Sequence, residues 1–272
     1  MKTILLATDF SQPANRSVYA AAQIASKQNA RLMLFHSYRF MNTYDDNFGY
    51  PIDEIEKLSL KKLSELKGKI EKEGYQNLEI ITCIRHGSII DTIEDVINEF
   101  EVSMVVMSSV GGSSIGIHYF GGTVIKMIHK LKMPMLILPP GFKVSNIENV
   151  VMAVDLKKPI DESTLEKSIY FLRDLNAIVD VLYVAKSTAE ADSEPIREAA
   201  LHLRSLLKNV PHTFGVIIGK SQVQEITGFV KKRKAQLLIT FPAHHTFFEN
   251  IFLQGNTRRL VFDVEAPVLA LQ

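Results

Sequence analysis

The amino-acid sequence predicts an α/β protein made of two doubly wound domains, each with a five-stranded parallel sheet. Short apolar runs alternate with segments whose apolar residues recur every three or four positions, the pattern of buried strands between amphipathic helices. The second half of the chain also repeats the order of the first, including an aspartate after its first strand, Asp9 and then Asp155. Because crossovers between parallel strands are right-handed, the helices are expected to cover both faces of each sheet.

Five strands are expected in the first half, each a run of apolar residues without polar alternation. Strands buried on both faces have this composition, which is typical of parallel sheets. The predicted strands are Ile4–Ala7, Leu32–Phe35, Leu78–Ile84, Val102–Met107 and Met135–Leu138. Between them the apolar spacing is helical, as in Ile89, Ile93 and Val96. Ser11 followed by Pro13 predicts the start of the first helix, since serine caps helix starts and proline is tolerated in the first turn.

The second half predicts the same elements again. Its expected strands are Val150–Val154, Ile178–Val184, Phe214–Ile218, Leu237–Thr240 and Val268–Leu271. Pro134 and Pro267 match as the residues before the two final strands. Prolines, a glycine and polar residues interrupt the apolar runs over Pro139–Asn149, which marks a boundary. We therefore expect one domain over residues 1–142 and a second over residues 147–272.

Composition and charge narrow the function classes. The 272 residues carry a net charge of +1, and 46% are hydrophobic. Without a large basic field, neither nucleic acid nor an anionic membrane is an expected partner. Cys83 is the only cysteine, which excludes an internal disulfide and fits a reducing compartment. No apolar run reaches the roughly 20 residues that cross a bilayer, so a cytoplasmic protein is expected.

A ligand site is expected where the parallel strands end, at the point where the strand order reverses. In the first half this edge carries Thr8 and Asp9, Ser37 after strand two, His86–Ser88 after strand three, and the glycine-rich loop of Met107–Val124. The loop runs through Gly121 and Gly122 into a helical segment, and backbone N–H groups at a helix start bind anions. A flexible connection without a ligand is the alternative.

The combination of "ILLATDFS", "VVMSSVGG…FGGTVIKMIHKLKMPMLILP" and a repeat of the whole unit resembles the universal stress protein family in its tandem form. The resemblance covers nearly the whole chain. It implies Rossmann-like domains of five parallel strands, paired through their final strands into an internal pseudo-dimer. In one branch of the family it also implies ATP, held by a G-x-x-G-x9-G-[ST] loop and an aspartate after strand one.

Aligned from Pro134, the motif falls on Ser108, Gly111, Gly121 and Gly122, so two of its three glycines are present. Thr123 is one position late for the motif's hydroxyl; alternatively, Gly122 and Thr123 form the final pair and Gly112 is the middle glycine. Asp9 matches the carboxylate on the adenine side, and Ser37 falls where the family has a small apolar residue against the base. The resemblance thus implies a site for ATP, with Mg²⁺ as a further expectation, on these residues: Ala7, Thr8, Asp9, Ser37, Met107, Ser108, Gly111, Gly112, Gly121, Gly122 and Thr123.

The same alignment in the second half places Phe241, His244, Gln254 and Gly255 on the motif, so that half is expected to bind no nucleotide in this way. Asp155 is then a strand-end cap. The sequence shows no catalytic residues and no metal-ligand cluster, and the basic run Lys231–Lys234 is interpreted as a solvated face. The expected function is a nucleotide-binding regulatory protein of the stress response, with a protein partner that the sequence does not identify, as a monomer or homodimer. An interaction protein without nucleotide and a slow ATP hydrolase are the alternatives.

Overall fold

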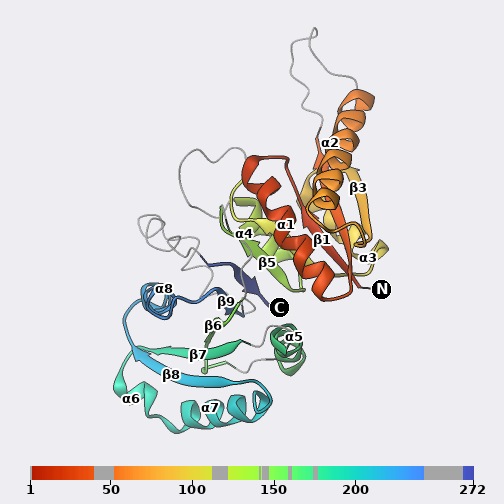
Figure 1. The fold of residues 1–272 in the computed structure, drawn as a ribbon. Coiled ribbons are helices and arrows are strands. Elements are labelled where there is room, and N and C mark those ends of the chain that lie inside the picture. The colour runs from red at the N-terminus through yellow and green to blue at the C-terminus, as the bar shows by residue number, and fades with distance from the viewer. Residues whose placement is uncertain are drawn as a thin grey trace, which may run out of the picture. The chain divides into compact units, whose positions relative to one another are not determined.

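The fold was obtained as a computed structural model that describes residues 2–39, 52–111, 122–140, 142, 147–158, 161–173, 177–241 and 266–272. Strands and helices alternate along the chain, as predicted (Figure 1). The chain divides into two compact units. The first unit contains strands β1–β4 and helices α1–α4, and the second contains β5–β10 and α5–α8.

The first unit has a parallel sheet in the order β3-β2-β1-β4. Its elements are β1 (Thr3–Ala7), α1 (Gln12–Lys27), β2 (Arg31–Tyr38), α2 (Ile52–Lys72), β3 (Ile80–His86), α3 (Ile89–Glu99), β4 (Val102–Ser108) and α4 (Gly122–Lys130). The chain moves outward from β1 to β2 and β3, then returns to the other side of β1 as β4. The strand order therefore reverses between β1 and β4, which is where sheets of this kind bind ligands.

Helices α1 and α2 pack against each other (Figure 1). Helices α3 and α4 also pack against each other. Helix α1 begins as predicted, with the Ser11 side chain accepting a hydrogen bond from Ala14 N and a proline in the first turn. Its buried face is rich in alanine, which lets the helix lie close to β1, β2 and β4. This close packing fixes the first turn of α1 at the carboxyl end of β1, beside the candidate site.

The second unit repeats the arrangement. Its elements are β5 (Met135–Leu138), β6 (Asn149–Val154), α5 (Glu162–Arg173), β7 (Ile178–Ala185), α6 (Thr188–Ala191), α7 (Glu194–Leu206), β8 (His212–Ile218), α8 (Gln222–Arg233), β9 (Leu237–Thr240) and β10 (Val268–Ala270). Strands β10, β9, β6, β7 and β8 are parallel. Strand β5, which ends the first repeat, pairs antiparallel with β10, which ends the second. The two final strands thus pair with each other, as the family resemblance implies.

Strand registers support the repeat residue by residue. Ala7 lies opposite Phe35 and Met107, whereas Ala153 lies opposite Leu182 and Thr240. Ala153 therefore occupies the position of Ala7. Two residues further on, Asp9 and Asp155 are equivalent, as predicted.

The prediction was wrong in detail at the sheet edges. Residues 78–84 were expected to form a strand buried on both faces, but β3 is an outer strand of the sheet in its unit and Thr82 is exposed. Strand β8, also an outer strand, leaves Val216 and Ile218 about half exposed. An apolar run has the same composition whether one face or both are covered, so the sequence did not separate edge strands from central ones. No helix in the described part of the chain is long and apolar enough to span a membrane.

Candidate functional site

The turn after β1 positions the candidate carboxylate, Asp9. The Ser11 backbone N–H donates to Asp9 Oδ1 at 3.0 Å, and the Phe10 backbone N–H donates to Thr8 Oγ1, also at 3.0 Å. Asp9 itself is exposed, whereas Thr8 is buried. These local hydrogen bonds fix the direction in which the carboxylate leaves the sheet. Asp9 therefore lies at the carboxyl end of β1. Its side chain is accessible to solvent and is oriented by a backbone hydrogen bond.

Phe10 has a left-handed backbone, with φ of 61°. This conformation is an outlier for a bulky residue and costs roughly 1–2 kcal/mol. Three contacts offset that cost. Asn15 Nδ2 donates to the Phe10 carbonyl at 3.1 Å, the ring packs on His36 at a centroid distance of 4.3 Å, and Lys62 Nζ lies 5.2 Å from its centroid. The surroundings of Phe10 thus hold the turn that carries Asp9, and no sequence pattern predicted this conformation.

Gly111 lies directly against Asp9. A Cβ atom at residue 111 would stand 2.7 Å from Asp9 Oδ2, closer than real Cβ contacts allow. The glycine matters here through this close approach and not through its φ, which is not in the left-handed region. Gly111, predicted for the loop after β4, and Asp9, predicted for the end of β1, are therefore neighbours in space.

Ser108 ends β4, at the position where the family motif has its first glycine. Its φ is not positive, so a side chain at this position causes no backbone strain. The residue is 7% exposed, and its Oγ atom has no hydrogen-bond partner within the described part of the chain. Met107 precedes it and is equally buried.

Strand β2 extends further than predicted and carries Ser37 within it. Ser37 was expected after the strand, but it pairs with Arg85 in the β2–β3 ladder. His36, the residue before it, lies in the same pairing row as Thr8, and its Nδ1 atom is 2.8 Å from the Thr8 carbonyl oxygen. Since a carbonyl only accepts, Nδ1 carries the proton. Burial lowers the pKa of His36, and this outweighs the opposing effects of the Thr8 hydrogen bond and of the Asp9 charge.

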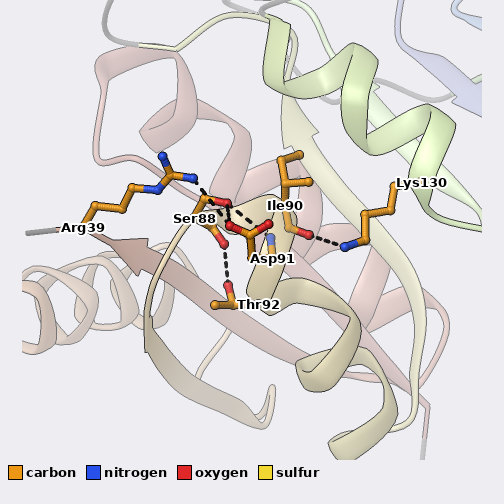
Figure 2. Close-up of polar contacts among 6 residues, drawn as sticks. All are labelled: Arg39, Ser88, Ile90, Asp91, Thr92 and Lys130. Atoms are coloured by element: carbon orange, nitrogen blue, oxygen red, sulfur yellow. Dashed lines mark hydrogen bonds and ion pairs between the residues drawn. The ribbon is translucent and has the colours of Figure 1, made fainter.

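The turn between β3 and α3 caps its own helix (Figure 2). Ser88 Oγ accepts from the Asp91 backbone N–H and donates to Asp91 Oδ2 at 2.5 Å, while Arg39 lies 3.6 Å from the same oxygen. On the other side, Lys130 at the end of α4 donates to the Ile90 carbonyl at 2.7 Å. The side chain of Asp91 thus already provides a negative charge at this helix start. His86–Ser88 were expected at the ligand edge, and these contacts give Ser88 a structural role as the helix cap.

Helix α4 begins at Gly122, as the glycine-rich segment predicts. Gly122 and Thr123 are both exposed, and nothing within 4 Å would meet a Cβ atom on Gly122. Gly112 and Gly121, the remaining predicted loop residues, lie outside the described residues.

The second unit has an equivalent aspartate, Asp155, with different neighbours. Asp155 Oδ1 accepts from the Lys157 backbone N–H at 3.1 Å, the strand-end cap that was expected. Lys157 Nζ lies 2.8 Å from Glu190, which also accepts a hydrogen bond of 2.7 Å from the Tyr183 hydroxyl. Burial raises the pKa of Tyr183, and Glu190 raises it further. Of the residues matched to the loop motif here, Phe241 is described, and His244, Gln254 and Gly255 lie outside the described residues.

An ion pair between a buried carboxylate and a half-exposed arginine also went unpredicted in the second unit. Asp180 on β7 is 4% exposed and receives two hydrogen bonds from Arg233, at 2.5 and 2.7 Å, and one from Thr213. Burial by itself would raise the pKa of Asp180, but the hydrogen bonds from Arg233 and Thr213 prevail and lower it. The basic run Lys231–Lys234 is therefore not only a solvated face, because its arginine neutralises a buried carboxylate.

No group of three or more metal-ligating His, Cys, Asp or Glu side chains occurs among the residues that the structure describes. The fold and the edge at β1 and β4 define a class: a tandem, doubly wound α/β protein whose first repeat brings Asp9 and Gly111 together. Residues 1–139, more than half of the chain, match the universal stress protein family. The chain belongs to that family.

Solved structures agree with this fold over the whole length. A universal stress protein from Archaeoglobus fulgidus DSM 4304 matches with a TM-score of 0.74 at 16% identity, over 98% of this chain and 95% of that one. A protein of unknown function from Pseudomonas aeruginosa PAO1 matches with a TM-score of 0.67 at 17% identity, over 100% of this chain and 92% of that one. At these identities the likeness concerns the fold. A comparison with curated protein sequences gives no match.

Proposed function

We propose that the first unit binds an adenine nucleotide, ATP, at the carboxyl ends of β1 and β4, and that the protein regulates or protects in the stress response through this binding. Asp9 lies on the base side, with Ala7 and Thr8 before it at the end of β1 and Ser37 on the neighbouring strand β2. The phosphates face the loop from Met107 and Ser108 through Gly111, Gly112 and Gly121 to Gly122, and Thr123 supplies a hydroxyl. Mg²⁺ would accompany the triphosphate as a phosphate-bound ion.

The contact between Asp9 and Gly111 carries the proposal. Two residues that lie about a hundred positions apart in the sequence meet at the strand-order reversal, and any side chain at residue 111 would displace the carboxylate from its present position. The normal backbone of Ser108 supports the proposal further, because the lost glycine of the motif leaves no strain in the strand end.

The second unit is proposed to bind no nucleotide. At the position of His36 it has Tyr183, whose hydroxyl is tied to Glu190, and Lys157 joins the same carboxylate. Side chains of the second repeat thus interact with one another close to Asp155, the aspartate that matches Asp9.

Calorimetric titration of the full chain with ATP and Mg²⁺ tests the proposal. We expect one ATP per chain, an affinity at least tenfold weaker in Asp9→Ala, and no change in the matched control Asp155→Ala. An absence of binding at millimolar ATP would refute nucleotide binding and favour the interaction protein without nucleotide. Phosphate release faster than in a buffer control would instead favour the slow hydrolase.

A further inference from the structure

His36 contacts both neighbours of Asp9 in the turn after β1. Its Nδ1 atom donates to the Thr8 carbonyl oxygen at 2.8 Å, and its ring stacks on Phe10 at a centroid distance of 4.3 Å. Thr8 precedes Asp9 in the chain, and Phe10 follows it. Because β2 pairs with β1, the sheet backbone fixes where the His36 ring stands. The ring therefore helps to hold the turn from which the Asp9 carboxylate projects.

Two charged groups from the elements packed around β2 act on the His36 ring, within the described part of the chain. The Asp9 carboxylate attracts a positive charge on the ring, whereas the ammonium group of Lys62 on α2 repels it. Lys62 Nζ also lies 5.2 Å from the centroid of the Phe10 ring, so Phe10 already has one cation beside it. The β3 residue that pairs with His36 is Ile84, which carries no charge. A proton gained by His36 therefore changes the forces on both Asp9 and Phe10.

The fold favours the neutral form of the His36 ring. The ring is half-buried, and removal from water penalises its charged form. In setting the pKa of His36 below its ordinary value, burial outweighs the hydrogen bond to Thr8 and the attraction of Asp9. Histidine is the side chain whose charge changes near neutral pH, so acidification charges this ring before it neutralises the carboxylate beside it.

We propose that protonation of His36 weakens nucleotide binding at Asp9, so that the first unit responds to acidification. This inference rests on the proposed function and adds regulation to the same site. An imidazolium ring attracts the Asp9 carboxylate and competes with the ligand for its oxygen atoms. Repulsion from Lys62 also weakens the stacking of the ring on Phe10. Both effects oppose the orientation of the carboxylate that the neutral ring stabilises.

Protonation and nucleotide binding are linked, so the proposal has two independent readouts. If the protonated protein binds ATP less tightly, bound ATP must lower the pKa of His36 by the same coupling free energy. NMR of the His36 Cε1–H resonance measures this pKa with and without ATP. A His36 ring that served packing alone would keep the same pKa when ATP binds.

Calorimetric titration of the full-length protein with ATP at about pH 7.5 and about pH 5.5 tests the proposal. His36→Asn keeps an N–H donor at the place of Nδ1 but does not titrate. Phosphate groups themselves titrate at about pH 6, equally for every variant, so the wild type is compared with the variant at each pH. The ATP affinity of the wild type is expected to fall at least about twofold more than that of His36→Asn.

His212 provides a matched control. It is half-buried on β8 in the second unit, and its Nδ1 atom lies 2.9 Å from the Val210 carbonyl oxygen. His212→Asn thus removes a titrating ring with a similar backbone contact, away from the proposed site. Its ATP affinity is expected to fall with pH as much as that of the wild type.

Three results would each overturn the inference while the proposed function stands. They are an equal loss of ATP affinity in wild type and His36→Asn, a smaller loss in His212→Asn than in wild type, and a His36 pKa that ATP leaves unchanged or raises. A wild type that binds no ATP at either pH would overturn the proposed function as well, so the two failures are distinguishable.

Discussion

Substitution of Gly111 by alanine tests the geometry of the site most directly. The added methyl group would stand 2.7 Å from Asp9 Oδ2, whereas ordinary van der Waals contact begins near 3.4 Å. The carboxylate must therefore move by somewhat under 1 Å or rotate away. Either movement disturbs the hydrogen bond from Ser11 N to Asp9 Oδ1, which is 3.0 Å long.

The free energy of unfolding is expected to change little in this variant. Loss of one hydrogen bond to an exposed carboxylate costs about 1 kcal/mol. Replacement of glycine by alanine at a compatible φ restricts the unfolded chain and returns about 0.4–1 kcal/mol. The two effects nearly cancel, so a net change within about 0.5 kcal/mol is expected. ATP affinity, by contrast, should fall at least tenfold, because the base-side carboxylate is displaced.

Denaturant unfolding and ATP calorimetry on the same preparations measure both quantities. Gly68→Ala and Gly228→Ala are the controls, because a Cβ atom on either glycine meets nothing within 4 Å. Both glycines lie inside helices, so alanine should stabilise the protein by about 0.5–1 kcal/mol and leave ATP affinity unchanged. Wild-type ATP affinity in Gly111→Ala would show that the position of Asp9 does not matter for binding.

Three further predictions concern stability. Asp180→Asn should lower the free energy of unfolding by about 2 kcal/mol, a value below that for a fully buried pair because Arg233 is half exposed. Folding lowers the pKa of Asp180, so its contribution to the free energy of unfolding is complete above the ordinary pKa of 3.8 and is lost at lower pH. The free energies of unfolding of wild type and Asp180→Asn, measured by urea titration, should therefore converge in acid. The lowered pKa of His36 means that folding favours the neutral ring, so the free energy of unfolding of the wild type should fall as pH drops below 6.5. His36→Gln should remove this dependence on pH. An unchanged dependence would exclude His36 as its source. Gly87→Ala should destabilise by about 1–3 kcal/mol in thermal unfolding, since φ is 130° and the new methyl would meet Thr92 Cγ2 at 2.9 Å; a stabilised variant would contradict this.

The strands were predictable from the sequence because burial leaves a direct trace in composition. The run Met135–Leu138 is a strand with these bounds, and β4 ends one residue beyond the prediction. Where a strand continues beyond its apolar residues, composition no longer predicts it. His36, Ser37 and Tyr38 prolong β2 through backbone pairing with β3, which depends on the neighbouring strand and not on the type of residue.

Two residues of the candidate site were predictable for a different reason. Asp9 and Gly111 stand out by residue type at strand ends, and the fold brings strand ends together. Phe10 and His36 do not stand out in the sequence. Phe10 matters through its left-handed φ, and His36 through its stacking on Phe10 and its contact with the Thr8 carbonyl. Such features arise from tertiary packing, which a one-dimensional pattern does not record.

Comparison of the two repeats shows what distinguishes a candidate ligand site from a structural turn. The aspartate and its hydrogen bond to the backbone two residues on are the same in both, so Asp9 and Asp155 do not by themselves mark a site. The differences lie beside the aspartate. The first repeat places a glycine against the carboxylate and leaves the Ser108 hydroxyl unpaired. The second satisfies Tyr183 with Glu190 and Glu190 with Lys157. An unpaired buried hydroxyl does not separate the repeats, because Thr240 of the second repeat has one too. The contact of Gly111 with the carboxylate is therefore the feature on which the proposed site of the first repeat depends.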